Sequence, residues 1–454
     1  MPKTAALVLA AGKGTRMHSD NPKVLQTLLG EYMLTYVLAA LRPHFGEDIW
    51  IVAGHQARML ESAFPRGRFV FQAEQLGTGH ALRQALPALA EAGCRHILVV
   101  NGDTPLLDAQ VTQTFLEKAG EADLAFAVLE LADPASYGRV MRESGKVRAV
   151  VEAKDCDPLT LKLNHEVNAG MYLLSLHLAE TLSPRINRAN KSGEYYITDL
   201  VALAVAGGYE ARAVECGREE SLLGVNSPPE LSRMEEILRE RVAERLLQSG
   251  VLLHAPDQVR VSPFARIEPG AELTGPCEIL GRSEVKSGAR VASHCVVRDS
   301  VIDEGAELRH FSHLEGVRVG KGALVGPFAR LRPGASLEAN SRVGNFVELK
   351  NVRLGEGAKA NHLTYLGDAD VGAGANIGAG TITCNYDGQH KYRTSIGEKA
   401  FVGSNTALVA PVVVGANTLV GAGSVITGDV PEGEMAIARS RQKNLSRKKI
   451  SSEY

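Results

Sequence analysis

The sequence predicts two domains of different fold class: an α/β domain with a mainly parallel sheet, then a parallel β-helix of hexapeptide repeats. Short apolar runs alternate with helix-like stretches over residues 1–227. Aliphatic residues recur every six positions over residues 251–454, and a charged segment with a helical period, residues 228–250, joins the two parts. We therefore expect two domains and a linker helix with these boundaries.

Composition limits the classes of partner. Lys plus Arg number 50 against 52 Asp plus Glu in a chain of 454 residues, which gives a formal net charge of -2. Without a global positive field, the chain is expected to bind neither nucleic acid nor an anionic membrane, and its partners are predicted to be small molecules. The six cysteines form no CxxC pair and no run reaches the length of a membrane span, so we expect a cytoplasmic protein.

In the first part, runs of β-type apolar residues mark the expected strands: residues 4–9, 48–52, 96–100 and 124–129. Helix-like stretches lie among them, for example residues 81–92 and 111–120. This alternation is typical of a mainly parallel sheet that is covered by helices.

The joining segment is predicted to be one helix. Two prolines and Glu230 follow Ser227 in the first turn, and Gly250 ends it. One face is apolar: Leu231, Met234, Leu238, Val242 and Leu246. The other face is expected to be solvated because it is densely charged: Arg233, Glu235, Glu236, Arg239, Glu240, Arg241, Glu244 and Arg245.

Three runs with a period of six identify the second part. The first contains Val261, Ile267, Leu273, Ile279, Val285, Val291 and Val297; the second Val319, Val325, Leu331, Leu337, Val343 and Leu349; the third Ile396, Val402, Leu408, Val414, Val420 and Ile426. One inward aliphatic residue per short strand is the signature of a parallel β-helix. Residues 299–316 fit the phase poorly. It breaks again between Gly378 and Ser395, where we expect a functional loop outside the coils.

The loop after the first expected strand combines small residues with two cations. It runs Leu9-Ala10-Ala11-Gly12-Lys13-Gly14-Thr15-Arg16-Met17, and Lys23 follows shortly after. Small residues let backbone N–H groups approach a ligand closely, and Arg16 and Lys23 add positive charge. The pattern indicates a phosphate-binding loop, although its spacing matches neither the P-loop nor the dinucleotide fingerprint.

This loop resembles the signature of the sugar-1-phosphate nucleotidyltransferase family, and further motifs of that family follow in the same order. Residues 72–79 are similar to the segment that reads the uracil base, and Asn101-Gly102-Asp103 is similar to the metal-binding turn. The resemblance implies a Rossmann-like domain, UTP as a co-substrate, and Mg²⁺ held by Asp103 and Asn226. It also implies a nucleotide-sugar site that contains Leu9, Ala10, Ala11, Gly12, Lys23, Gln72, Gly77, Thr78, Asn101, Gly102, Asp103, Tyr137, Gly138, Glu152, Asn168, Tyr196, Thr198 and Asn226.

These residue types suit phosphoryl transfer. A sugar phosphate is already anionic near neutral pH, so its attack needs no protein base. The difficulty is to bring anions together and to stabilise the charge on departing pyrophosphate. Arg16 and Lys23 are therefore the expected catalytic cations, beside Mg²⁺.

Polar residues interrupt the repeats shortly before the excursion loop, and His362 lies among them. Its neighbourhood resembles the acetyltransferase half of the family of bifunctional uridyltransferase/acetyltransferases that make UDP-N-acetylglucosamine. Both halves and the linker occur in that family's order. The resemblance implies a left-handed β-helix that transfers acetyl from acetyl-CoA to glucosamine-1-phosphate, before uridylyl transfer from UTP in the first domain. An imidazole is suited to deprotonate the sugar amine, so His362 is the expected base.

The same resemblance implies two groups of contacts on the β-helix. Substrate contacts are expected from Arg332, Glu348, Lys350, Tyr365, Asn376, Asn385, Tyr386 and Lys391. Acetyl-CoA contacts are expected from Ala379, Ser404, Ala422 and Arg439. Glu348 is also expected to orient His362, and the tail from Arg441 onward has no assigned contact.

A coil of three short strands forms a prism whose flat faces suit a closed ring of subunits. The resemblance implies a homotrimer whose acetyl-transfer sites lie at subunit boundaries, with the excursion loop reaching a neighbour. It also implies a role in peptidoglycan and lipopolysaccharide synthesis, and hence in cell wall biogenesis and cell shape. Two alternatives remain open: a monofunctional nucleotidyltransferase with a purely structural solenoid, and a nucleotide-sugar-binding regulator without turnover.

Overall fold

The computed structural model describes residues 3–12, 14–54 and 56–446. Lys13 of the expected phosphate loop and the end of the tail, residues 447–454, lie outside the described residues. The chain forms two compact units, Met1–Leu238 and Arg239–Tyr454, and the division falls within helix α8 (Pro228–Gln248). Among the helices in the described ranges, none has the length and apolar character needed to cross a membrane.

The first unit is built on a mixed sheet. Its strands lie in the order β11 (Ala211–Glu215), β7 (Leu124–Glu130), β10 (Glu166–Ser175), β6 (His96–Asn101), β1 (Thr4–Leu9), β4 (Ile49–Ala53) and β5 (Arg68–Phe71). Neighbours are parallel except at β10, which is antiparallel to both β6 and β7. The hairpin β8 (Arg139–Glu143) and β9 (Lys146–Val151) joins the sheet through β10.

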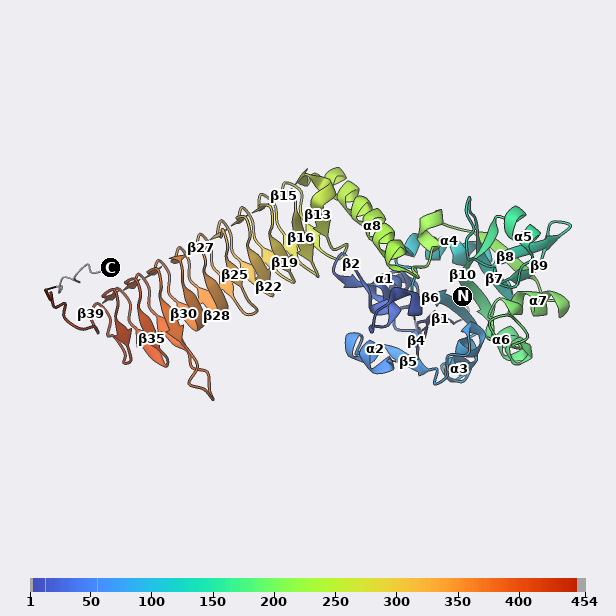
Figure 1. Ribbon diagram of the computed structural model, residues 1–454, viewed down its shortest axis with the longest axis horizontal. Coiled ribbons are helices and arrows are strands. Elements are labelled where there is room, and N and C mark those ends of the chain that lie inside the picture. The colour runs from blue at the N-terminus through green and yellow to red at the C-terminus, as the bar shows by residue number, and fades with distance from the viewer. Residues whose placement is uncertain (1–2, 13, 55, 447–454) are drawn as a thin grey trace, which may run out of the picture. The chain divides into compact units, whose positions relative to one another are not determined.

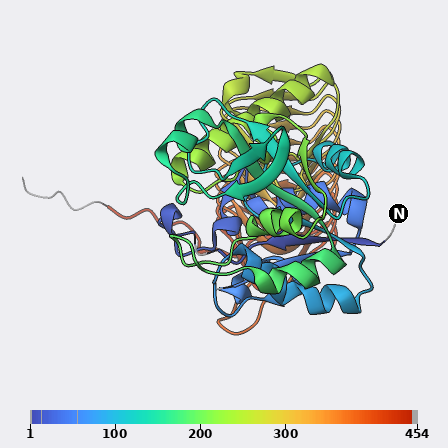
Figure 2. The ribbon, with the colours of Figure 1, turned by 90° about the vertical axis from the view of Figure 1, so that its right-hand side faces the viewer.

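Helices cover both faces of this sheet (Figure 2). They are α1 (Met33–Phe45), α2 (Ala57–Ala63), α3 (Thr78–Glu91), α4 (Ala109–Ala119), α6 (Leu176–Leu182) and α7 (Asp199–Ala206), whereas the short α5 (Pro158–Leu163) buries no side chain. Successive residues of β1 alternate between two apolar cores. Ala6 and Val8 pack with residues of α1 and α4, whereas Ala5 and Leu7 pack with residues of α3, α6 and α7.

The predicted strands at residues 4–9, 48–52, 96–100 and 124–129 are confirmed as β1, β4, β6 and β7. The sequence did not reveal β10, because Asn168 and Gly170 interrupt its apolar pattern. Gly170 has φ 77°, and the pairing of β10 with β7 shifts register between Asn168 and Tyr172. A glycine in the left-handed region is what such a bulge requires.

Helix α8 confirms the predicted apolar stripe, since Met234, Leu238, Val242 and Leu246 are buried. The prediction that Arg239 lies on the solvated face is wrong. Its side chain is buried and Nη1 donates to the Pro256 carbonyl at 2.8 Å. A guanidinium can bury its methylene stem when its head finds such an acceptor, which a charge count does not reveal.

The second unit is a prism of stacked parallel coils (Figure 1). One face is the sheet β12 (Leu252–His254), β15 (Glu272–Thr274), β18 (Arg290–Val291), β21 (Glu307–Leu308), β24 (Leu324–Val325), β27 (Arg342–Asn345), β29 (Lys359–His362), β31 (Asn376–Ile377), β34 (Phe401–Val402), β37 (Leu419–Val420) and β39 (Met435–Ala436). The hexapeptide-repeat β-helix is thereby confirmed, while its left-handed sense stays a prediction.

The other two faces form one continuous sheet, because some strands run across the corner between them. It contains β13 (Val259–Val261), β14 (Arg266–Ile267), β16 (Cys277–Leu280), β17 (Glu284–Val285), β19 (Val296–Arg298), β20 (Val301–Ile302), β22 (His313–Glu315), β23 (Arg318–Val319), β25 (Arg330–Leu331), β26 (Ser336–Leu337), β28 (Glu348–Leu354), β30 (Tyr365–Val371), β32 (Ile382–Cys384), β33 (Thr394–Ile396), β35 (Ala407–Val409), β36 (Val412–Val414) and β38 (Val425–Ile426). All the aliphatic residues of the three period-six runs are buried.

The poor phase of residues 299–316 has a simple structural cause. The sequence separation of paired residues gives the length of a coil. In the first coils Val259 pairs with Cys277, whereas further along Val296 pairs with His313. The separation of the second pair is shorter than that of the first by a single residue. The coil is therefore slightly shorter here, and the column continues through the buried Leu314. The segment is ordinary β-helix with shortened corners.

The expected excursion leaves the coils after β32. Ala369 of β30 pairs with Thr394 of β33, and the stretch of chain between these partners is longer than in the preceding coils. The additional residues form a loop that projects from the side of the stack (Figure 1) and is closed by an antiparallel bridge between Tyr386 and Lys391. The coil resumes at β33 with its phase intact.

We predict that Leu314→Ala destabilises the second unit by about 2–5 kcal/mol, because it opens a cavity in the aliphatic column. Glu315→Ala, at the exposed neighbouring position, should change the free energy of unfolding by less than about 0.5 kcal/mol. Urea denaturation followed by circular dichroism measures both. Equal effects would show that Leu314 does not face the core.

Candidate active sites

The first site lies at the carboxyl ends of β1 and β6, where parallel α/β sheets commonly bind ligands. Two adjoining cavities of about 530 and 260 Å³ share Leu9, Thr78, Asn101 and Asp103 in their walls. The larger cavity contains the remaining predicted residues of the loop and the base-reading segment: Ala10, Ala11, Gly12, Lys23, Gln72 and Gly77. The smaller contains most of the predicted sugar-pocket residues, with one predicted catalytic cation and the predicted metal ligand just before α8: Tyr137, Gly138, Glu152, Asn168, Thr198, Arg16 and Asn226.

Two predicted residues, Gly102 and Tyr196, do not line either cavity. Gly102 is closely packed, since a Cβ there would lie 3.1 Å from Val24 Cγ1 and 3.2 Å from the Leu9 carbonyl oxygen, and its place in the site stays a prediction. Gly77 is also sterically required. Its φ is 108°, and a Cβ would lie 2.5 Å from the Tyr195 carbonyl oxygen.

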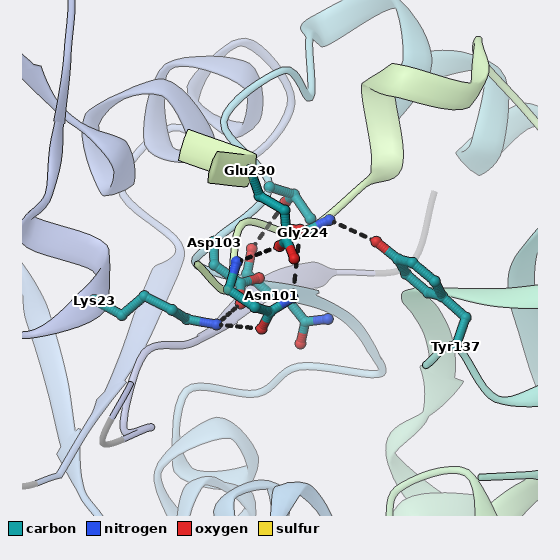
Figure 3. Close-up of polar contacts among 8 residues, drawn as sticks. Lys23, Asn101, Asp103, Tyr137, Gly224 and Glu230 are labelled. Carbon is teal, nitrogen blue, oxygen red and sulfur yellow. Dashed lines mark hydrogen bonds and ion pairs between the residues drawn. The ribbon is translucent and has the colours of Figure 1, made fainter. Parts of the chain in front are cut away.

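The two predicted metal ligands converge on the ammonium of Lys23, which Figure 3 shows beside Asp103. Lys23 Nζ donates to Asp103 Oδ2 and, at 3.0 Å, to Asn226 Oδ1. These groups come from three distant segments, and the Lys23 and Asp103 side chains are mostly buried. Their oxygens therefore already form a position that favours positive charge.

Hard oxygen donors fit Mg²⁺, which usually takes one or two protein ligands and completes its shell with phosphates and water. Asp103 and Asn226 supply one carboxylate and one amide oxygen at the Lys23 position. Across the described ranges, no group of three or more His, Cys, Asp or Glu side chains offers a ready-made metal cage. The donor set thus suits a metal that arrives with a nucleotide.

The segment that carries Asn226 is fixed by contacts that the sequence patterns did not indicate. Glu230 Oε2 accepts from the Asn226 backbone N–H at 2.7 Å, and the Tyr137 hydroxyl accepts from the Gly224 N–H at 3.1 Å (Figure 3). The Val225 N–H donates to the Asp103 carbonyl at 2.8 Å. Glu230 had a signal as an acidic residue in the first turn of α8. Tyr137 was expected in the sugar pocket from the resemblance, but its contact with Gly224 was not.

Glu152 and Thr198 form a pair in the smaller cavity. Thr198 Oγ1 donates to Glu152 Oε1 at 3.1 Å. Burial raises the pKa of Glu152, and the Thr198 hydrogen bond opposes part of that rise. A polar ligand that donates hydrogen bonds to the Glu152 carboxylate would therefore offset the cost of burying its charge.

The second site lies on the β-helix, where His362 ends β29. His362 Nδ1 and Asn345 Oδ1, in the coil below, are 2.5 Å apart. Because the amide oxygen is an acceptor, Nδ1 is the donor and Nε2 keeps a free lone pair. His362 is exposed, so Nε2 is accessible to a ligand.

Glu348 does not take the orienting role predicted for it. Glu348 Oε1 accepts from Arg332 Nη1 at 3.0 Å, and Asn345 orients His362 instead. The spacing of Glu348 from Lys350 correctly predicted that both side chains lie on the same side of one strand. It could not show that His362 projects from a corner of the prism, where residue 345 of the preceding coil is its neighbour.

The predicted cationic residues gather beside this face. Arg332 and Lys350 follow paired positions in consecutive coils, because Leu331 pairs with Leu349. The pKa of Lys350 is lowered, first by the side chain of Lys391 beside it and then by desolvation. Adjacent ammonium groups of this kind favour an anionic ligand.

Lys391 and Asn385 contact their own chain. Lys391 lies against Lys350, and Asn385 Nδ2 donates to Asp368 Oδ2. Tyr386 is exposed on the loop and donates to the Gly388 carbonyl at 2.6 Å. The Tyr365 hydroxyl lies over Gly367, where any side chain would collide with it. Asn376 lies on β31, in the same sheet as His362, between Lys359 of β29 and Phe401 of β34.

The residues predicted to contact acetyl-CoA form a single column. Ala379, Ser404 and Ala422 follow paired positions of β31, β34 and β37 at one corner of the prism. The Arg439 Nη1 donates to the Ala422 carbonyl at 2.7 Å. The pairing of β29 with β31 places His362 at the foot of this column.

Comparison with known proteins gives two domain matches and many full-length relatives. Residues 6–166 match the MobA-like NTP transferase domain, and residues 393–428 match the bacterial transferase hexapeptide, six repeats. The Bifunctional protein GlmU of Nitratidesulfovibrio vulgaris strain DP4 is 60% identical over 448 residues, which is 98% of each chain. Those of Oleidesulfovibrio alaskensis and Lawsonia intracellularis are 55% and 48% identical, over 97% and 98% of each chain.

The fold and sites thus define a nucleotidyltransferase domain joined to a hexapeptide-repeat transferase domain. At this identity and coverage, the chain belongs to the GlmU family of bifunctional proteins.

We predict that Glu152→Gln changes the pH dependence of stability. A carboxyl group with a raised folded-state pKa makes the folded state less stable as pH rises above the unfolded pKa, because the folded state holds its proton more tightly. Glutamine removes this effect. The melting temperature of the variant, relative to wild type, should therefore be higher at about pH 7 than at about pH 4, and thermal unfolding at both values measures it. A difference independent of pH would contradict the raised pKa.

Proposed function

We propose that the chain catalyses two successive steps of UDP-N-acetylglucosamine synthesis. Acetyl is transferred from acetyl-CoA to glucosamine-1-phosphate, and uridylyl is then transferred from UTP to N-acetylglucosamine-1-phosphate with release of pyrophosphate. The observation that carries the proposal is the coexistence of two separate polar sites, around Asp103 and around His362, in one member of a bifunctional family.

For acetyl transfer, we assign His362 as the general base. Asn345 fixes the tautomer that leaves Nε2 to take a proton from the sugar ammonium. The amine nitrogen then bonds to the thioester carbonyl carbon, the carbon–sulfur bond breaks, and the second proton that the nitrogen loses protonates the departing thiolate. Arg332, Lys350 and Lys391 would bind the sugar phosphate, with Tyr365 and Asn376 beside it.

The predicted coenzyme column fits an extended thioester. Ala379, Ser404 and Ala422 present small side chains at one corner, so a pantetheine chain could lie along them without a steric clash. Arg439 at the end of the column would bind the coenzyme phosphates. Asn385 and Tyr386 are assigned to the sugar side of the same site.

For uridylyl transfer, the larger cavity would hold the nucleotide and the smaller one the sugar phosphate. A phosphate oxygen of the sugar bonds to the α-phosphorus of UTP, and the bond from that phosphorus to the pyrophosphate oxygen breaks. Arg16 lines the sugar cavity and Lys23 the nucleotide cavity, so both could offset charge at the reacting phosphates. Mg²⁺, held by Asp103 and Asn226, would neutralise phosphate charge and fix the nucleotide's orientation.

A monofunctional nucleotidyltransferase with a structural solenoid explains the second site less well. A purely structural coil has no need of an imidazole held in one tautomer beside clustered ammonium groups. A binding regulator without turnover likewise has no need of an oxygen pair that favours a cation.

We further propose a cytoplasmic homotrimer that serves peptidoglycan and lipopolysaccharide synthesis. The prism carries an exposed stripe of stacked rings, Phe311, Phe328 and Phe346, which a second copy would remove from water. Lys391 and Asn385 contact their own chain, so Tyr386 is the loop residue best placed to reach a neighbour. A monomeric mass by light scattering would contradict the trimer.

We predict reciprocal losses in two variants. Asp103→Asn should lower pyrophosphate release by at least about 100-fold, because the site loses the charge that holds its cations. Thiol release from acetyl-CoA should stay within about twofold of wild type. His362→Ala should do the opposite, with a loss of about 100- to 10,000-fold in thiol release, the range of general-base catalysis. Pyrophosphate and thiol are measured separately, and equal loss of both in a folded variant would refute two independent sites.

A further inference from the structure

One buried cation in the described part of the first unit has no carboxylate partner. Arg139, at the start of β8, is 2% exposed, and no ion pair with a carboxylate is formed by it within the described ranges. Burying an unpaired charge is costly unless hydrogen bonds replace the lost water. Its guanidinium donates instead to main-chain carbonyls of the loop just before it: Pro134 at 3.3 Å, Ala135 at 3.3 Å, and Tyr137.

The loop that Arg139 holds is in a constrained conformation. Ala135 has φ 38°, in the left-handed region that a residue with a side chain rarely adopts. The Ala135 N–H donates to Asp133 Oδ1 at 3.1 Å, and the Tyr137 N–H donates to the Pro134 carbonyl at 3.0 Å. Three carbonyls that face one guanidinium would repel each other without it. Arg139 therefore keeps this turn closed.

The loop ends in residues of the uridylyl-transfer site. Tyr137 and Gly138 both line the sugar cavity, and the Tyr137 hydroxyl also accepts from the Gly224 N–H at 3.1 Å (Figure 3). Gly224 begins the short segment that delivers Asn226 Oδ1 to within 3.0 Å of Lys23 Nζ. A continuous line of hydrogen bonds thus runs from the buried guanidinium, through Tyr137, to the segment bearing a predicted metal ligand.

We propose that Arg139 and Tyr137 are positioning residues that couple the sugar cavity to the cation position, with Arg139 fixing the loop and the Tyr137 hydroxyl fixing residues 224–226. The inference rests on the proposed uridylyl transfer. Neither residue needs to contact a reacting atom. Displacement of the loop would move Gly138 and Asn226 together, so sugar-phosphate affinity and metal affinity should weaken together.

The test compares Tyr137→Phe with wild type. Phenylalanine keeps the ring packing but leaves the Gly224 N–H without its acceptor. Loss of one such bond corresponds to a change of roughly 5- to 20-fold. Mn²⁺ affinity, measured by electron paramagnetic resonance on the full chain without substrates, should weaken by that factor. The KM for N-acetylglucosamine-1-phosphate should rise similarly, while thiol release from acetyl-CoA stays unchanged.

Arg139→Lys and Arg139→Met extend the test to the buried guanidinium of Arg139. Lysine keeps the charge and part of the hydrogen bonding, so it should retain more Mn²⁺ affinity than methionine. Arg142→Gln is the matched control, because Arg142 lies on the same strand but is exposed and pairs with Glu166. It should leave Mn²⁺ affinity and KM at wild-type values.

The outcomes separate this inference from the proposed function. Wild-type Mn²⁺ affinity in Tyr137→Phe would overturn the inference, whatever the activity. A lower melting temperature with unchanged Mn²⁺ affinity would assign these residues a structural role alone and would also overturn it. A wild-type chain that releases no pyrophosphate would instead refute the proposed uridylyl transfer. The Mn²⁺ affinity of Tyr137→Phe therefore tests the positioning role of Arg139 and Tyr137 independently of the reaction.

Discussion

The ammonium of Lys23 joins parts of the first unit that lie far apart in the sequence. It follows the glycine-containing loop after β1, and its partners lie at the end of β6 and just before α8. Two oxygen groups that converge in a mostly buried place repel each other unless a cation lies between them. The Lys23 ammonium therefore ties the loop after β1 to the end of β6 and to the segment that enters α8.

A different constraint governs the second unit, where position is set by the register of stacked coils. Side chains one coil apart in the sequence become neighbours, and the length of that coil differs along the stack. His362 and Asn345 meet for this reason, as do the small residues of the predicted coenzyme column. Chemistry on a β-helix thus depends on the length of each corner as much as on the residue types.

Much of this could be predicted from the sequence. Strand and helix order in the first unit and the inward columns of the second follow from local periodicity, which reports burial directly. Many residues of both cavities were expected from the family resemblance, whose motifs fall in loops at one edge of the sheet. Others, such as Ser136, Ala169 and Leu222, carried no signal. The motif that predicts Gly102 in the site does not show that its lack of a side chain also allows close packing against Val24 and Leu9.

What the sequence could not reveal are contacts that depend on three-dimensional register. No periodicity shows that Asn345 rather than Glu348 holds His362, since that depends on a corner of the prism. No charge pattern shows that Arg139 and Arg239 are buried on carbonyl groups, because their acceptors are backbone atoms present in every residue. The antiparallel strand β10 was hidden by its bulge at Gly170.

The central claim is that Asp103, Asn226 and Lys23 define the cation position of the first site. A crystal grown with Mn²⁺ and UDP-N-acetylglucosamine tests it most directly, because anomalous scattering locates the metal without reference to activity. The account predicts one strong peak between Asp103 and Asn226, with Lys23 Nζ displaced from the carboxylate toward the phosphates. A peak bound elsewhere in the first unit, with Lys23 still paired to Asp103, would contradict it.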